Sequence, residues 1–93
     1  MSPGDPLARF ERVALTGGPT PLQPAERLSE ALGVEVHIKR DDLTVVGLGG
    51  NKLRKLEFIL GDALASGCEA LVTFGAIQSN HARQSAAACA RVG

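Results

Sequence analysis

The feature of this 93-residue sequence that most restricts its fold is a change of hydrophobic period from residue 34 onward. Residues 34–38 alternate apolar and polar side chains, which is typical of a half-buried strand. A helical stripe follows over residues 52–66, then a nearly continuous apolar run over residues 70–74, then an alanine-rich segment. A strand, helix, strand and helix in this order predict an α/β layered fold with a parallel sheet.

The helix expected over residues 52–66 has large apolar side chains at spacings of three and four. This stripe consists of Leu53, Leu56, Ile59, Leu60, Ala63 and Leu64. Asn51 is a suitable N-cap for this helix, and Ser79 or Asn80 is suitable for the last one. A short helix is also expected over residues 24–32, because Pro24 fits a first helical turn and Gly33 fits a C-terminal stop.

Such a sheet is incomplete by itself, because parallel strands normally have neighbours on both edges and helices over both faces. The strand at residues 70–74 would keep an exposed edge, and the final helix should lead into another strand. We therefore expect residues 1–93 to form a single incomplete domain. Residues 1–16 would be a surface arm, with some packing through Phe10 and Val13.

Composition excludes several classes of partner. Ten basic side chains balance ten acidic ones, which argues against nucleic acid. The apolar runs are far shorter than the about 20 residues that span a bilayer, so no membrane partner is expected. The first ten residues lack the apolar segment of a signal peptide, which predicts a cytoplasmic protein. Cys68 and Cys89 form no zinc spacing with the two histidines, so we expect no metal and two buried thiols.

The first polar loop comprises Gly49, Gly50, Asn51 and Lys52, at the start of the expected helix. It is not a Walker A phosphate loop, because Asn51 interrupts the Gly-Lys-Ser/Thr order that this motif requires. Helix N-termini still offer free N–H groups and a partial positive charge, which favour phosphates and carboxylates. A lysine in a first helical turn is, by itself, usually just solvated.

The second polar loop leads into the last helix and carries Gln78, Ser79, Asn80, His81, Arg83 and Gln84. Taken by itself, this loop is explained most simply by helix capping. Both loops, however, follow the carboxyl ends of expected strands, which is where open α/β sheets bind ligands.

The two loops together resemble a known family. Gly-Gly-Asn-Lys-x-Arg-Lys-Leu-Glu at residues 49–57 and Gln-Ser-Asn-His-x-Arg-Gln at residues 78–84 are similar to the fold-type-II pyridoxal-phosphate enzymes. The resemblance is greatest to the D-cysteine desulfhydrase and 1-aminocyclopropane-1-carboxylate deaminase family. It extends over residues 20–22, 27–33 and 38–44, and starts near Arg9. It implies the N-terminal part of a tryptophan-synthase-β-like fold, with pyridoxal 5'-phosphate as the cofactor.

The resemblance also implies roles for four residues around the cofactor. Lys52 would be the Schiff-base lysine and the base that removes the substrate α-proton. Asn80 would hydrogen-bond the ring hydroxyl of the cofactor. Lys55 would reach the phosphate from the next turn of the helix, and Asn51 would support that site.

On the substrate side the resemblance implies Ser79 beside the substrate carboxylate or reacting carbon, with Gln78 and His81 nearby. The deaminases commonly have glutamine where His81 stands, so His81 favours D-cysteine, which would give pyruvate, sulfide and ammonia. A deaminase acting on 1-aminocyclopropane-1-carboxylate is the alternative. Full-length relatives would be homo-oligomers that act on small amino acids.

A third alternative is a truncated, non-catalytic homologue. The family's glycine-rich phosphate cup, the group opposite the pyridine nitrogen and the later substrate tyrosines would all lie beyond Gly93. We therefore expect little or no turnover from the 93-residue chain.

Overall fold

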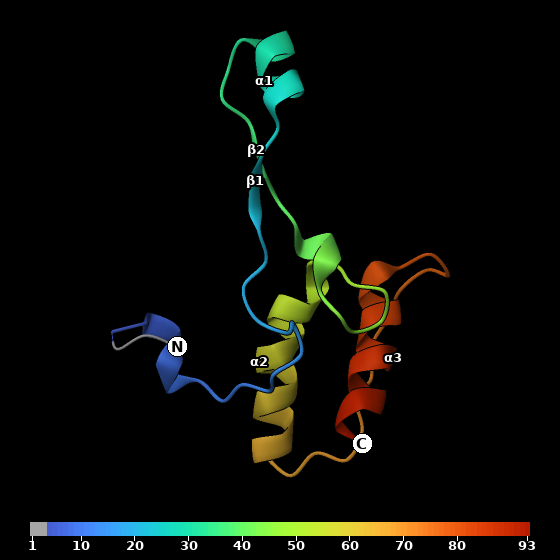
Figure 1. The fold of residues 1–93 in the computed structure, drawn as a ribbon. Helices are drawn as coiled ribbons and strands as arrows, with labels where there is room; N and C mark the ends of the chain where they lie inside the picture. Colours follow the sequence, from blue (N-terminus) through green and yellow to red (C-terminus); the bar gives the residue numbers. More distant parts are fainter. Residues whose placement is uncertain (1–3) are drawn as a thin grey trace.

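The computed structural model describes residues 4–93. Its elements are, in order, a 3-10 helix (Pro6–Arg9), β1 (Leu22–Pro24), α1 (Glu26–Leu32), β2 (His37–Lys39), a 3-10 helix (Asp41–Leu43), α2 (Lys52–Ala65) and α3 (Asn80–Val92). Figure 1 shows α2 and α3 side by side, with their N-terminal ends at the same end of the pair. The hairpin of β1, α1 and β2 projects away from these helices.

The core lies where α2 and α3 meet. Leu53, Leu56 and Leu60 of α2 are 0 to 4% exposed, and Ala88 of α3 is fully buried against them. The sequence predicted both helices to within about one residue at their starts. Leucines at spacings of three and four on α2 meet the small side chains of α3, which allow the two helices to approach closely.

The buried face of α2 differs from the predicted stripe. Ile59 is 41% exposed and Leu64 is 50% exposed, whereas Glu57 and Gly61 are buried. The N-terminal arm causes this difference, because it packs along α2 at these two positions. A Cβ on Gly61 would lie 2.6 Å from the carbonyl carbon of Glu11, so only glycine permits this approach.

The expected arm is therefore partly buried. Leu15 and Thr16 are 2% and 7% exposed, and the Val13 N–H donates to the Glu57 carbonyl oxygen over 3.0 Å. Phe10 was expected to pack but is 49% exposed, with the Arg9 guanidinium over its ring. The part of the arm at residues 1–3 lies outside the described residues.

The prediction of a parallel sheet is wrong for the described residues. Their sheet has two strands, and β1 and β2 pair antiparallel with Leu22 opposite Lys39. Residues 70–74 form no strand; Val72 and Phe74 are 79% and 90% exposed. An apolar run becomes a parallel strand only when neighbouring strands accept its backbone hydrogen bonds, and residues 4–93 offer it none.

Three smaller sequence predictions also differ from the structure. Pro24 ends β1 instead of starting a helix, and α1 begins at Glu26. The strand expected at residues 34–38 is shifted to His37–Lys39, because the Val36 N–H donates to Ser29 Oγ of α1 over 2.8 Å. Cys68, expected to be buried, is exposed.

Candidate functional site

A left-handed loop precedes α2. Four consecutive residues have positive φ: Gly47 (61°), Leu48 (67°), Gly49 (78°) and Gly50 (139°). Such angles favour glycine, and close contacts add to the requirement. A Cβ on Gly47 would lie 2.7 Å from the Ala87 Cβ of α3. The sequence Gly-Leu-Gly-Gly therefore allows a tight loop that runs directly against α3.

Thr44 fixes the end of this loop. Its hydroxyl oxygen, in a side chain that is almost fully buried, accepts a hydrogen bond from the Gly50 N–H (2.8 Å). The same hydroxyl lies 2.9 Å from the Asp41 carbonyl oxygen, to which it donates. The Gly50 N–H also lies 3.1 Å from that carbonyl oxygen. The backbone two residues before Lys52 is thus held by the 3-10 helix that follows β2.

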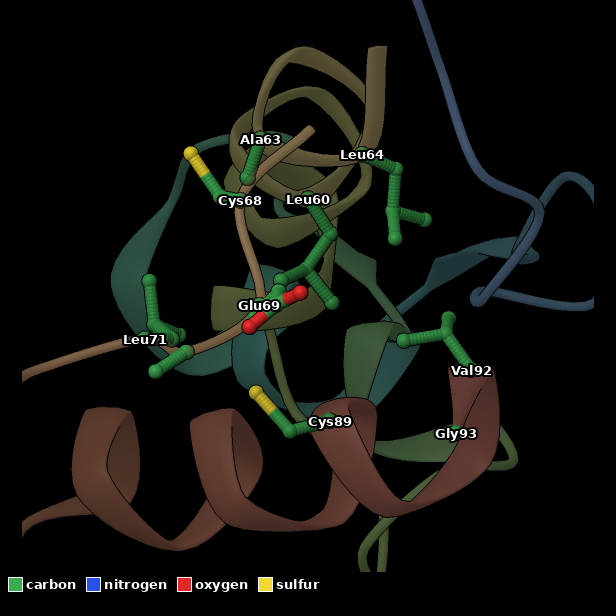
Figure 2. A pocket seen from close by; sticks show the side chains of 10 residues that line it. Leu60, Ala63, Leu64, Cys68, Glu69, Leu71, Cys89, Val92 and Gly93 are labelled. Atoms are coloured by element: carbon green, nitrogen blue, oxygen red, sulfur yellow. The ribbon is translucent and has the colours of Figure 1, made fainter. Parts of the chain in front are cut away.

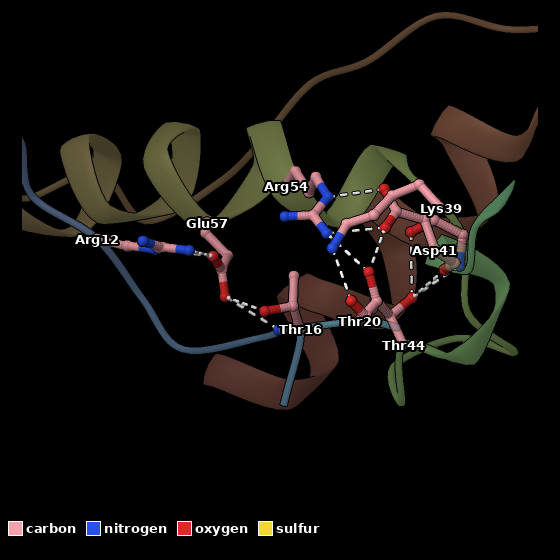
Figure 3. Close-up of polar contacts among 9 residues, drawn as sticks. Arg12, Thr16, Thr20, Lys39, Asp41, Thr44, Arg54 and Glu57 are labelled. Carbon is pink, nitrogen blue, oxygen red and sulfur yellow. Dashed lines mark hydrogen bonds and ion pairs between the residues drawn. The ribbon is translucent and has the colours of Figure 1, made fainter. Parts of the chain in front are cut away.

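The Asp41 carboxylate ties the hairpin to the first turn of α2 (Figure 3). Arg54 donates to it from Nε and Nη2, both over 2.7 Å, and the Thr20 hydroxyl donates over 2.7 Å. Lys39 Nζ donates to the Thr20 carbonyl oxygen over 2.6 Å. The hydrogen bonds from Arg54, and then that from Thr20, hold the pKa of the Asp41 carboxyl well below its usual range.

The N-terminus of α3 has a side-chain cap, as the sequence predicted. Ser79 has extended backbone angles, and its Oγ accepts a hydrogen bond from the Ala82 N–H over 3.1 Å. Asn51 differs from the prediction, because its side chain makes no cap hydrogen bond. Its backbone is already helical (φ −75°, ψ −17°), whereas a capping residue normally has extended angles.

Alanine substitutions at the N-termini of α2 and α3 should differ in their effect on the free energy of unfolding. We expect Ser79→Ala to lower the free energy of unfolding by about 1 kcal/mol, because the Ala82 N–H loses its acceptor. Asn51→Ala should change it by less than about 0.5 kcal/mol, because no cap hydrogen bond is lost. Urea denaturation of both variants checks this difference. Equal losses would show that Asn51 caps α2 in solution.

The structure brings the two predicted loops together. Arg83 Nη2 donates to the Gly49 carbonyl oxygen over 3.2 Å, and the carboxamide of Gln84 lies against Gly50. Loop residues 47–50 therefore run along the first two turns of α3. Because α2 and α3 point the same way, the positive ends of both helix dipoles lie at this end of the molecule (Figure 1).

The side chains of the predicted site residues differ in exposure. Lys52 is the first residue of α2 and is half-buried, as are Ser79 and His81. His81 Nε2 lies 3.5 Å from the Ser85 hydroxyl, and its buried Nδ1 has no hydrogen-bond partner. The other predicted site residues are exposed: Asn51, Lys55, Gln78 and Asn80. The loops thus meet through their backbones, while these four side chains face solvent.

Two hollows lie elsewhere. One of about 440 Å³ lies beside the C-terminal ends of α2 and α3 (Figure 2), and its wall includes Leu60, Leu71, Val92 and both cysteines. Another of about 420 Å³ borders Arg12, the glycines at residues 17 and 18, and Glu57. Neither is lined by a predicted site residue. Within residues 4–93, no cluster of three or more His, Cys, Asp or Glu side chains could hold a metal ion.

Sequence reasoning missed the residues that hold the loop in place. Thr44, Asp41, Arg54 and Gln84 contact the lysine loop or its neighbours, yet none was singled out for this purpose. Gln84 carried one usable signal, since it lies on the helix face that includes Ala88. A polar side chain on an inward face predicts a specific contact.

Comparison with known proteins identifies the family. The family model described as "Pyridoxal-phosphate dependent enzyme" matches residues 13–93. The chain belongs to this family. Pyridoxal phosphate is the cofactor of the family. Among the described residues 4–93, none of the helices has the length and apolar character of a membrane span.

Individual relatives narrow the similarity within the pyridoxal-phosphate enzymes. The D-cysteine desulfhydrases of Salmonella paratyphi B and Salmonella newport are each 59% identical over 87 residues, covering 94% of this chain and 26% of the relative. A crystal structure described as that of an ACC deaminase homologue superposes with a TM-score of 0.88 at 49% identity, covering 94% of this chain and 27% of that one. The α/β fold of the family is confirmed, and the chain spans about a quarter of its relatives' length.

The residues at this end of the molecule fit an aldehyde that carries a phosphate. Lys52 is half-buried and comes shortly after the loop at residues 47–50. Three of the four residues of this loop are glycines, which have no Cβ. Two helix N-termini and the Lys55 ammonium supply positive charge for an anion. A Cβ on Gly75 would lie 2.7 Å from Ser79 Oγ, so a side chain at residue 75 would clash with the capping serine. The backbone of the second loop therefore passes close to Ser79.

Proposed function

We propose that this chain carries the lysine-bearing segment of a pyridoxal-phosphate enzyme that eliminates the thiol of D-cysteine, giving pyruvate, sulfide and ammonia. The observation that carries the proposal is the contact between the glycine loop before Lys52 and the turns of α3 behind Ser79. The cofactor, when bound, supplies an electron sink for the bond broken at the substrate α-carbon. The protein then has to bind, orient and move a proton.

Lys52 is the residue to which we assign the proton transfer. Its amine would bind the cofactor aldehyde and later, when freed, remove the substrate α-proton. The half-buried position at the start of α2 supports this role, because the backbone there is fixed through Thr44 and Arg54. A base that is held in place beside the reacting carbon gains from proximity.

Three residues are assigned to the rest of the cofactor. Lys55 lies one turn after Lys52 and would bind the phosphate, together with N–H groups of the helix N-termini. Asn51, which makes no cap hydrogen bond, has its carboxamide free to support the same group. Asn80 would donate or accept a hydrogen bond at the ring hydroxyl.

Ser79, Gln78 and His81 are assigned to the substrate. Ser79 Oγ is directed by its hydrogen bond with the Ala82 N–H, and its own proton is available for a substrate carboxylate. His81 lies in the first turn of α3, two residues after Ser79, and this position supports a place beside the substrate. A cytoplasmic location and homo-oligomeric assembly are also part of the proposal and rest on the sequence alone.

A deaminase acting on 1-aminocyclopropane-1-carboxylate is the second candidate, and the 49% identical ACC deaminase homologue favours it. The 59% identity to desulfhydrases favours D-cysteine as the first choice. The two are distinguished by product, because only the thiol substrate releases sulfide.

A non-catalytic chain is the third candidate. Phe74 and Ile77, which lead into the second loop, are fully or almost fully exposed, so water reaches the proposed site from that side. We expect the purified 93-residue chain to produce pyruvate from D-cysteine no faster than free cofactor and substrate do. Steady pyruvate formation above that blank would reject this expectation.

The proposed function is tested first by adding pyridoxal phosphate to the purified chain, followed by borohydride reduction and peptide mapping. We expect an absorbance band of lysine-bound cofactor and a label concentrated on Lys52. An unrelated lysine-containing protein of similar size serves as the control for non-specific labelling. A label spread evenly over Lys39, Lys52 and Lys55 would contradict the assignment.

A further inference from the structure

Gln84 is a buried polar residue with no role in the proposed chemistry. It lies in the second turn of α3 and is 1% exposed. Its Oε1 has no hydrogen-bond partner among the described residues. A buried acceptor without a partner destabilises a fold, and an apolar side chain of the same length would avoid that penalty. Packing alone therefore does not explain a carboxamide at this position.

The carboxamide is in direct contact with Gly50. A Cβ built on Gly50 would lie 2.9 Å from Cδ and 3.0 Å from Oε1 of Gln84, and it would clash with Nε2. The planar amide thus occupies the space in which a side chain of residue 50 would lie. Arg83, which precedes Gln84, donates a hydrogen bond to the Gly49 carbonyl oxygen. Two adjacent residues of α3 therefore contact Gly49 and Gly50, two adjacent residues of the loop.

The conformation of Gly50 determines where α2 begins. Its φ of 139° is in the range that favours glycine, and Lys52 follows two residues later as the first residue of α2. Asn51 gives the helix no side-chain cap. Besides the ion pair of Arg54 with Asp41, the first turn of α2 is therefore supported by two contacts of Gly50: the hydroxyl of Thr44 and the carboxamide of Gln84.

We propose that Gln84 is a positioning residue for Lys52: its carboxamide, held by α3, fixes Gly50 and so sets the first turn of α2. Gln84 acts through the loop and does not touch a reacting atom. The significance for catalysis rests on the proposed function, in which Lys52 is the reactive lysine. The structural claim can be tested without cofactor.

The test compares Gln84→Ala and Gln84→Met in the full 93-residue chain. Met keeps the length of the side chain but lacks the planar amide. Arg91→Ala, an exposed change near the end of α3, is the matched control. The first measurement is amide hydrogen exchange at Gly50 and Arg54, whose N–H groups are hydrogen-bonded at the start of α2, with residues 56–60 in the middle of α2 as internal reference. The second is the rate at which acetic anhydride labels Lys52, relative to Lys55.

Both Gln84 variants should speed exchange at Gly50 and Arg54 about tenfold, with exchange at residues 56–60 and the Arg91→Ala control unchanged. The ratio of Lys52 to Lys55 labelling should change in the same two variants. If Gln84→Met behaves like the wild type, the side chain merely fills space and the proposal is overturned. If Gln84→Ala fails to fold, Gln84→Met decides the question by itself.

Failure of this inference and failure of the proposed function give different results. If the cofactor label were found elsewhere than on Lys52, the proposed function would fail, while exchange at Gly50 and Arg54 would still report on Gln84. Unchanged exchange in both variants, with cofactor still trapped on Lys52, would reject the positioning role and leave the proposed function intact.

Discussion

Lys52→Ala is expected to abolish the absorbance band of lysine-bound cofactor and to lower β-elimination by at least about a hundredfold, the usual minimum contribution of a general base. The reason is that one amine binds the cofactor and removes the α-proton. The sharpest assay uses a chimera in which the 87 matched residues of this chain replace their counterparts in the Salmonella paratyphi B desulfhydrase, which is 59% identical over them. The chimera supplies the rest of the fold that turnover requires.

Lys55→Ala is the matched control, because the two lysines lie one turn apart on α2. It should keep the band and weaken cofactor retention, since an ammonium on a phosphate contributes affinity and not the covalent bond. Persistence of the band in Lys52→Ala would move the assignment to Lys39 or Lys55. Lys39 is the weaker of these, because its Nζ already donates to the Thr20 carbonyl oxygen over 2.6 Å.

The helices were the most predictable part of this fold, because the signals that specify them are local. Leucines at spacings of three and four specify α2, and Ser79 specifies the start of α3 through one hydrogen bond with a residue three positions away. Asn51 shows the limit of such signals. Its residue type favours a cap, but the glycine loop directs its backbone into the helical region.

The sheet was the least predictable part, because strand pairing depends on residues that are far apart. The apolar run at residues 70–74 predicts a buried strand, yet Val72 and Phe74 are exposed. It does not indicate which strands would flank it, and the described residues provide none. The pairing of β1 with β2 was missed because Pro24 and the short length of β1 conceal a strand.

The candidate site was predicted chiefly from resemblance. Lys52 and Ser79 lie in motifs that resemble a family, whereas a first-turn lysine carries little weight by itself. Thr44 and Gln84 act by contacting Gly50 across 6 and 34 positions of the sequence. Contacts of this kind follow from the packing of α3 on the loop, which no periodicity reports.

Glu57 is a buried polar residue whose loss should strongly destabilise the described fold. It lies on the buried face of α2 at 2% exposure, where its carboxylate accepts from the N–H groups of Leu15 (2.7 Å) and Thr16 (2.9 Å) (Figure 3). Arg12 adds an ion pair of 2.6 Å from Nη2. Glu57→Ala leaves these donors without an acceptor, so we expect the free energy of unfolding to fall by about 3 kcal/mol. Urea denaturation at neutral pH measures the loss.

The matched control is Asp62→Ala, which removes an exposed carboxylate from the same helix. It should change stability by less than about 0.5 kcal/mol. Equal effects of the two substitutions would mean that the N-terminal arm does not dock on α2 in solution. In that case exchange at the Leu15 and Thr16 amides, expected to be slow in the wild type, would be fast.

The pH dependence follows from the same carboxylate. Burial by itself would raise the pKa of Glu57, but the hydrogen bonds from Leu15 and Thr16, and then the Arg12 guanidinium, outweigh it and hold the pKa below its usual value. The unfolded chain therefore binds the proton more readily than the folded chain. The stabilisation is fully present above the ordinary carboxyl pKa of about 4.5 and is lost as the pH falls through the lower folded value. Asp41 contributes with the same sign. Glu57→Gln should accordingly weaken the loss of stability between neutral and acid pH without abolishing it, and an unaltered acid slope would show that the Glu57 carboxylate is not held by the arm.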